Sequence, residues 1–124
     1  MSILFRLELA GLPPSVNQMY RTGRQGQRYK RPEVEEWQSE VAKQLREAWG
    51  DKRPFVGEVL LKIEFSVKTN RRWDVDNRLK ALIDCLELGG VIHYDAQVAG
   101  INAKRVNRDE IRTIIEMSEY PYWE

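Results

Sequence analysis

Several features that define other classes of protein are missing from this sequence. The single cysteine, Cys85, excludes an internal disulfide, so the composition does not indicate an oxidising compartment. No segment approaches the run of about 20 apolar residues that crosses a bilayer. Residues 1–11 carry Arg6 and Glu8 where a secretory signal would be apolar. We therefore expect a cytoplasmic protein without a membrane partner, in which Cys85 is a buried apolar residue.

The sequence also lacks an excess of positive or negative charge, since its net charge is only +1. This balance alone gives no support for nucleic-acid binding. The distribution of charge is more informative, since the segment between Tyr20 and Pro32 is basic and contains no acid. Its basic residues are Arg21, Arg24, Arg28, Lys30 and Arg31. Such an arm suits an anionic partner at one place on the surface, and an ordinary solvated loop is the alternative.

The pattern of apolar residues predicts one domain, residues 1–124, with an α/β (α+β-like) fold. Alternation predicts strands near residues 3–9, 58–67, 97–106 and 110–117. Apolar residues three and four apart predict a helix from Pro32 and another from about Asp76. From Pro14 to Lys30 the apolar residues do not recur at the spacing of a helix or a strand. We therefore expect a long basic loop there. The order β-α-β-α-β-β predicts a mixed sheet with two main helices on one face.

Two acids separated by one residue are the first candidate for chemistry. Asp74 and Asp76 flank Val75, so their side chains point the same way in extended backbone. Two carboxylates repel unless protons or a cation neutralise them, and Mg²⁺ commonly uses one or two carboxylates with substrate phosphates. The same D-V-D-N letters also suit a helix cap followed by a first-turn acid, and Asp76 or a neighbour can cap this helix.

Further polar residues share the helix that these acids introduce. Asp76, Lys80 and Asp84 are four residues apart, so they lie on one face, opposite the leucines. Lys80 can reach a phosphate held beside Asp76, although a solvated ladder of ion pairs has the same spacing. Asp95 follows a Gly-Gly pair that ends the helix, and a chain reversal there would bring it back beside the helix.

The chain resembles the RusA-like Holliday junction resolvases, small dimeric endonucleases common in bacteria and their prophages. Residues 13–21, P-P-S-V-N-Q-M-Y-R, are similar to the family's P-P-S-x-N-x-x-Y-R segment. Residues 71–77, R-R-W-D-V-D-N, are similar to its basic run leading into D-x-D-N, and Lys80, Asp84 and Leu86 match K-x-x-x-D-x-L. Residues 95–98 match D-x-Q-V. One departure is Tyr94, where members often have an acid.

The resemblance implies a metal-dependent endonuclease that makes paired symmetric cuts in four-way or branched DNA. It implies that Asp74, Asp76 and Asp95 are catalytic and hold Mg²⁺, with Mn²⁺ as a substitute, and that Lys80 is needed for cleavage. It also implies a homodimer, which supplies two symmetric nicks. Candidates for groups that support the ligands are Asn77, Asp84 and His93. His93 as a general base is one interpretation, and a packing or solvent-exposed histidine is the other.

The DNA would be held mainly through its phosphates, by basic residues on both sides of the cut. The predicted DNA-binding residues are Asn17, Tyr20, Arg21, Arg24, Arg28, Lys30, Arg31, Lys68, Arg71, Arg72 and Arg78. Tyr20, Tyr29 and Trp73 can stack on bases exposed at a branch point, although packing is the more usual role of a tryptophan. A non-catalytic module that binds branched DNA, with the acids as caps, is the main alternative. A D-x-D enzyme acting on nucleotides or sugars is another, but no glycine-rich phosphate loop is present.

Overall fold

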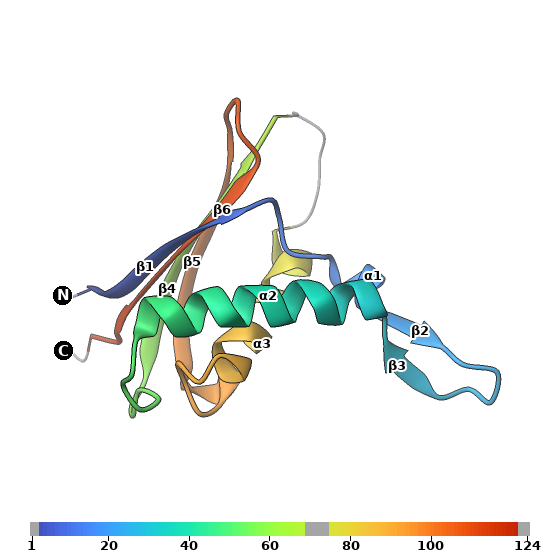
Figure 1. The fold of residues 1–124 in the computed structure, drawn as a ribbon. Helices are drawn as coiled ribbons and strands as arrows, with labels where there is room; N and C mark the ends of the chain where they lie inside the picture. Colours follow the sequence, from blue (N-terminus) through green and yellow to red (C-terminus); the bar gives the residue numbers. More distant parts are fainter. Residues whose placement is uncertain (1–2, 69–74, 122–124) are drawn as a thin grey trace.

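The helices and strands follow one another in the predicted order, with four short additions. The structure is a computed structural model that describes residues 3–68 and 75–121. Four long strands and two long helices account for most of it (Figure 1). No helix within these ranges is long and apolar enough to span a membrane. The elements are β1 (Ile3–Ala10), α1 (Val16–Met19), β2 (Tyr20–Thr22), β3 (Arg28–Lys30), α2 (Pro32–Trp49), β4 (Val59–Val67), α3 (Asp76–Leu88), the 3₁₀ turn η1 (Asp95–Gln97), β5 (Val98–Asn107) and β6 (Arg112–Glu119).

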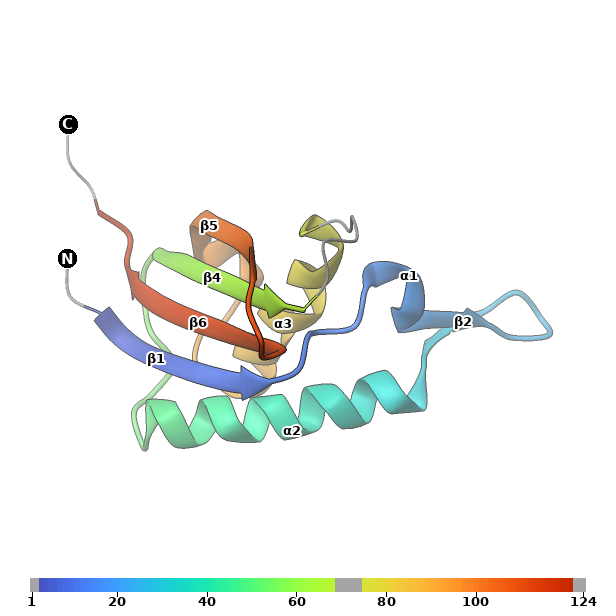
Figure 2. The ribbon, with the colours of Figure 1, turned by 90° about the horizontal axis from the view of Figure 1, so that it is seen from above.

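The four long strands form one mixed sheet in the order β1-β6-β4-β5. β4 pairs parallel with β5 and antiparallel with β6, and β6 pairs antiparallel with β1. A parallel pair needs a crossover connection, and α3 with η1 provides it between β4 and β5. Helices α2 and α3 lie on the same face of the sheet (Figures 1 and 2). The predicted α/β fold with a mixed sheet is confirmed.

The core lies between this face of the sheet and the two long helices. The predicted alternation along β4 is observed, because every second side chain from Val59 to Val67 is buried. Side chains from both helices join the same cluster. They are Val41, Leu45 and Trp49 from α2, and Leu82, Cys85 and Leu86 from α3. Because α3 is anchored along one side by this burial, the residues on its other side have fixed positions relative to the sheet.

Helix α2 begins and ends where its sequence predicts. Pro32 stands at the start, where its missing N–H costs no helical hydrogen bond, and Glu33 and Glu35 lie in the first turn. At the other end Gly50 adopts a positive φ of 87°, and its N–H donates to the carbonyl oxygen of Arg46 at 2.9 Å. This conformation is readily available to glycine, which explains why the helix stops at Trp49.

The expectation of a structureless loop up to Lys30 is wrong. The chain forms the single turn α1 and then an antiparallel hairpin of β2 and β3. Figures 1 and 2 show this hairpin projecting beyond the first turn of α2, away from the sheet. The N–H of Gly23 donates to the carbonyl oxygen of Gln27 at 2.7 Å, and Gly26 adopts a φ of 83° in the turn. Gly23 and Gly26 therefore close a hairpin.

Asp76 is not the cap of α3, in contrast to one of the expectations. The residue before the helix is Val75, whose own side chain makes no capping hydrogen bond. Asp76 is instead the first helical residue, and it is exposed. The helix dipole favours a carboxylate at this position. Asp76 is not the capping residue of the helix.

Candidate active site

Helix α3 carries its charged candidate residues on the side that the core leaves open. Lys80 and Asp84 lie one turn apart there, with the Nζ atom 3.6 Å from the Oδ2 atom. The Lys80 side chain is 50% exposed and that of Asp84 is 27% exposed. An ion pair this open to solvent adds little stability. The pair directs the Lys80 ammonium along the helix toward Asp84.

A hollow of about 530 Å³ lies next to this pair, where α3, η1 and β5 meet. Lys80 and Asp84 line it from α3, and Asp95 lines it from η1. Its other lining residues are Ile83, Ala96, Val98 and Ile101. Asp95 follows α3 in the sequence. The chain reversal after the helix brings Asp95 to the same hollow as Lys80 and Asp84. The structure thus gathers a lysine and two carboxylates around one cavity with an apolar wall.

Two glycines make the reversal that returns the chain to Asp95. A Cβ atom on Gly89 would lie 2.8 Å from the carbonyl oxygen of Ala42, so a larger residue would push α2 and α3 apart. Gly90 adopts a φ of 72°, which L side chains rarely take. The Glu87 carboxylate then accepts a hydrogen bond from the backbone N–H of Asp95. The local sequence therefore fixes Asp95 beside the last turns of α3.

Of the two acids of the D-V-D-N pattern, only Asp76 lies within the described residues. Asp76 is exposed in the first turn of α3, one turn before Lys80. Asp74 falls outside the described residues, as do Arg71, Arg72 and Trp73. Within residues 3–68 and 75–121, no three Asp, Glu, His or Cys side chains gather to form a metal site. The side chains of Asp76 and Asp95 offer oxygen atoms, the ligands that Mg²⁺ prefers. A metal site made of the carboxylates of Asp74, Asp76 and Asp95 stays a prediction.

The basic arm is the β2–β3 hairpin, and its residues differ in how they are used. Arg21 and Arg24 are exposed. The Arg28 guanidinium lies 4.5 Å from the ring centroid of Tyr20, a cation–π contact that covers one face of this ring. Tyr29 is 44% exposed. The hairpin therefore presents cations and one open aromatic side chain to a partner.

Lys30 is turned inward and connects the hairpin to α3. Its Nζ atom donates to the Oε1 atom of Gln38 at 2.7 Å. The Nε2 atom of Gln38 donates in turn to the carbonyl oxygen of Ala81 in α3 at 3.1 Å. Arg31 is also engaged, because its Nε atom donates to the carbonyl oxygen of Tyr20 at 3.4 Å. These bonds hold the base of the hairpin against α2 and α3.

Three more of the predicted DNA-binding residues, Asn17, Lys68 and Arg78, fall within the described parts of the chain. Arg78 donates from Nη1 to the carbonyl oxygen of Pro13 at 2.8 Å, which ties the P-P-S segment to the first turn of the helix. Asn17 and Lys68 are exposed, and Asn77 is half-buried. Arg78 therefore has a structural contact in addition to its charge.

His93 lies in the exposed turn before Asp95, outside the hollow that Asp95 lines. It contributes to a second hollow of about 440 Å³, together with Lys30, Asp84 and Glu87. Asp84 lines both hollows. The ring centroid of His93 is 6.0 Å from that of Tyr94, which is 69% exposed. His93 is solvent-exposed, as one of the two interpretations expected, and its role as a general base stays a prediction.

Cys85 is fully buried in α3. Burial raises the pKa of its thiol to about 12, the negative charge of Asp84 adds to the rise, and the positive charge of Lys30 opposes it. The thiol is therefore protonated at neutral pH. The prediction of a buried apolar residue is confirmed.

Two comparisons with known proteins bear on the identity of this site. Residues 11–118 match the family model described as Endodeoxyribonuclease RusA. The chain belongs to this family. The crossover junction endodeoxyribonuclease RusA of Aquifex aeolicus (strain VF5) is 28% identical over 116 residues, which cover 92% of this chain and 90% of the relative. The resemblance seen in the motifs is confirmed, and so is the predicted enzyme class, a nuclease that cuts DNA internally.

Two glutamines of this RusA-family chain matter to the site and were missed from the sequence. Gln38 is 3% exposed and makes the bonds between the hairpin and α3. The sequence offered one clue to this role. Gln38 lies four positions after Val34 and three before Val41, so helical spacing places this polar residue on the buried side of α2. Gln97 ends η1, and its side chain makes four hydrogen bonds. Its signal was its place in the D-x-Q-V motif.

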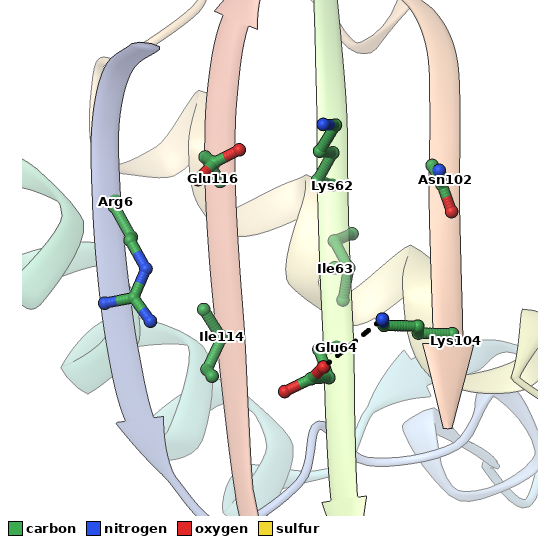
Figure 3. Close-up of a pocket in the computed structure, with 8 residues that line it drawn as sticks. All are labelled: Arg6, Lys62, Ile63, Glu64, Asn102, Lys104, Ile114 and Glu116. Carbon is green, nitrogen blue, oxygen red and sulfur yellow. Dashed lines mark ion pairs between the residues drawn. The ribbon is translucent and has the colours of Figure 1, made fainter. Parts of the chain in front are cut away.

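A further hollow, of about 310 Å³, lies on the sheet face that the helices leave open (Figure 3). Its charged residues alternate in sign along and across the strands. Lys104 pairs with Glu64 at 3.6 Å, and Lys62 stands opposite Glu116 in the β4–β6 register. Arg6 pairs with Glu8 at 3.2 Å. None of the residues that line this hollow lines the hollow of Lys80, Asp84 and Asp95, so this surface is not part of the candidate active site.

Proposed function

We propose that this chain is a divalent-metal-dependent endonuclease that resolves four-way DNA junctions by paired, symmetric cleavage of phosphodiester bonds. The observation that carries the proposal is the hollow that Lys80, Asp84 and Asp95 line together. Lys80 and Asp84 lie on α3, the helix that begins with Asp76. Membership of the RusA family supplies the reaction class, and the name of the Aquifex relative supports a crossover junction as substrate. An activity on DNA would also place the enzyme in the cytoplasm.

The charge of the hollow explains why a cation is required. Among the described residues that line it, Lys80 is the only basic side chain, and it faces two carboxylates. A phosphodiester approaching Asp84 and Asp95 would be repelled unless a positive charge were added. Asp76 and Asp95, together with Asp74, would hold Mg²⁺ or Mn²⁺. When bound there, the ion would polarise a phosphoryl oxygen and lower the pKa of a coordinated water.

Lys80 contributes a second, fixed positive charge. Its ammonium lies at the rim of the hollow and is held 3.6 Å from Asp84. There it can donate hydrogen bonds to a non-bridging or leaving oxygen of the scissile phosphate, where negative charge increases in the transition state. Asp84 keeps the Lys80 side chain oriented along α3. Lys80 therefore acts in the chemical step more than in binding of the DNA.

The hairpin would hold an arm of the junction. Arg21, Arg24 and Arg28 can neutralise phosphates, and Tyr29 can stack on a base left unpaired at the branch point. A four-way junction offers two equivalent strands to cut. We infer that a two-fold homodimer places one active site at each of them.

The proposal is tested with three variants and one matched control, measuring junction cleavage and junction binding separately. We expect Asp76→Asn and Asp95→Asn to abolish cleavage in Mg²⁺. We expect Lys80→Ala to lower the cleavage rate by about 100- to 1,000-fold while the junction affinity stays nearly unchanged. Asp51→Asn is the control, because Asp51 is an exposed acid beyond the end of α2.

If Lys80→Ala loses binding and cleavage to the same extent, the division of roles is incorrect. A wild-type protein that binds junctions tightly but leaves them intact in both Mg²⁺ and Mn²⁺ would favour the non-catalytic module instead. Tyr94, which replaces an acid common in the family, would then be the first residue to change.

A further inference from the structure

The side chain of Gln97 has an unusually complete set of partners. Its Oε1 atom accepts hydrogen bonds from the backbone N–H of His93 at 2.7 Å and of Tyr94 at 3.0 Å. Its Nε2 atom donates to the carbonyl oxygens of Phe55 and Gly57, both at 2.8 Å. A carboxamide offers two donor hydrogens and two acceptor lone pairs. All four are used, and all four partners belong to the backbone.

These bonds join two segments far apart in the chain. Phe55 and Gly57 lie in the loop before β4, whereas His93 and Tyr94 come directly before Asp95. The same loops also meet through the N–H of Phe55, which donates to the carbonyl oxygen of Val91 at 2.8 Å. This loop leads directly into β4, the most buried strand of the sheet. Gln97 therefore ties the turn that carries Asp95 to the loop at the start of β4.

We propose that Gln97 is the positioning residue for Asp95. By holding the two amides before Asp95, it sets the direction from which the Asp95 carboxylate enters the hollow shared with Lys80 and Asp84. Glu87 fixes the N–H of Asp95 itself from the α3 side. The inference rests on the proposed function, in that Asp95 is taken as a metal ligand. Groups that orient a ligand without touching the metal typically change metal affinity or activity by about 10- to 100-fold when removed.

The chemistry of the site requires an amide here. In Gln97→Glu, one carboxylate oxygen can still accept from His93 and Tyr94. The other oxygen would face the carbonyl oxygens of Phe55 and Gly57 with no hydrogen to donate, so repulsion replaces two hydrogen bonds. Gln97→Leu removes all four bonds at similar size. Both variants should loosen the turn, and neither changes a residue that would contact metal or DNA.

The test uses the full-length protein and three measurements on each variant. Mn²⁺ affinity is measured by electron paramagnetic resonance without DNA, the Mg²⁺ concentration for half-maximal junction cleavage is measured kinetically, and backbone exchange at residues 93–95 is followed by hydrogen–deuterium exchange. Thr113→Val is the matched control. The Thr113 hydroxyl is buried on β6 and donates to the carbonyl oxygen of Gly11 at 2.9 Å, so this variant loses a buried hydrogen bond away from the site.

We expect both Gln97 variants to exchange faster at residues 93–95, to bind Mn²⁺ about 10-fold more weakly or worse, and to need correspondingly more Mg²⁺. We expect Thr113→Val to leave all three measurements unchanged. Wild-type metal affinity in both Gln97 variants would overturn the inference, and so would an equal loss in Thr113→Val, which would reveal a general effect of stability. If the wild-type protein neither binds Mn²⁺ nor cuts junctions, the proposed function itself fails, a result distinct from failure of the Gln97 variants alone.

Discussion

Replacement of Gln38 by leucine tests whether a buried polar link joins the hairpin to α3. Gln38 lies in α2 with 3% of its surface exposed, between Lys30 of the hairpin and Ala81 of α3. Leucine has nearly the same volume, so the change removes hydrogen bonds without opening a cavity. The effect on stability can therefore be assigned to those bonds.

The size of the effect follows from the two bonds that are lost. The bond from the Lys30 ammonium, at 2.7 Å, is charge-assisted, and such bonds contribute about 1.5–3 kcal/mol. Because Lys30 is only half-buried and can turn toward water, the lower end of this range applies. The bond to the Ala81 carbonyl, at 3.1 Å, is neutral and contributes about 1 kcal/mol. That carbonyl keeps the Cys85 thiol as a donor at 3.2 Å, so it is not left unpaired.

We therefore expect Gln38→Leu to lower the free energy of unfolding by about 2–3 kcal/mol, which corresponds to a fall in melting temperature of roughly 10 °C. Urea unfolding followed by circular dichroism measures this directly, and an unchanged m-value would show that the unfolded state is not altered. Gln44→Leu is the control, because Gln44 lies half-buried on the same helix and its side chain makes no hydrogen bond among the described residues. A Gln38→Leu protein as stable as the wild type would refute the view that this link holds the hairpin in place.

Two further predictions concern the arm and the cysteine. The double variant Arg21→Gln, Arg24→Gln should weaken binding to branched and linear DNA alike. It should also reduce the slope of log affinity against log salt concentration by about 2, measured in chelator. Lys43→Gln, an exposed change on α2, should leave that slope unaltered, and an unchanged slope in the double variant would remove the hairpin from the DNA interface. The Cys85 thiol, with its pKa raised to about 12, should resist alkylation in the folded protein at neutral pH and react only as the pH approaches that value or after unfolding in urea. Rapid labelling of the native protein at pH 7 would contradict the burial.

The long elements of the fold could be predicted because each has a strong local pattern. The alternation along β4 and the proline-led amphipathic helix α2 depend only on neighbouring residues, so their bounds come out within one residue. The hairpin could not be predicted in this way. Its strands are three residues long and polar, and they are stabilised by Arg28 stacking on Tyr20 and by Lys30 reaching Gln38. Those contacts exist only in the folded chain.

The site shows the same division between local and distant information. The spacing of Lys80 and Asp84 follows from helical periodicity, and the return of Asp95 follows from the two glycines after α3. The roles of Gln97 and Gln38 depend on a loop and a helix some 40 residues away. No local pattern encodes such partners. The capping expectation for Asp76 failed because Val75 already adopts a helical conformation, which moves the cap position off the acid.

The most direct test of the central claim is incubation of the wild-type protein with a synthetic four-way junction and a linear duplex of the same sequence, in Mg²⁺ or in chelator. We predict paired nicks at symmetric positions in the junction alone, present in Mg²⁺ and absent in chelator. A junction that is bound but stays intact in Mg²⁺ and Mn²⁺, or a linear duplex cut as fast as the junction, would contradict it.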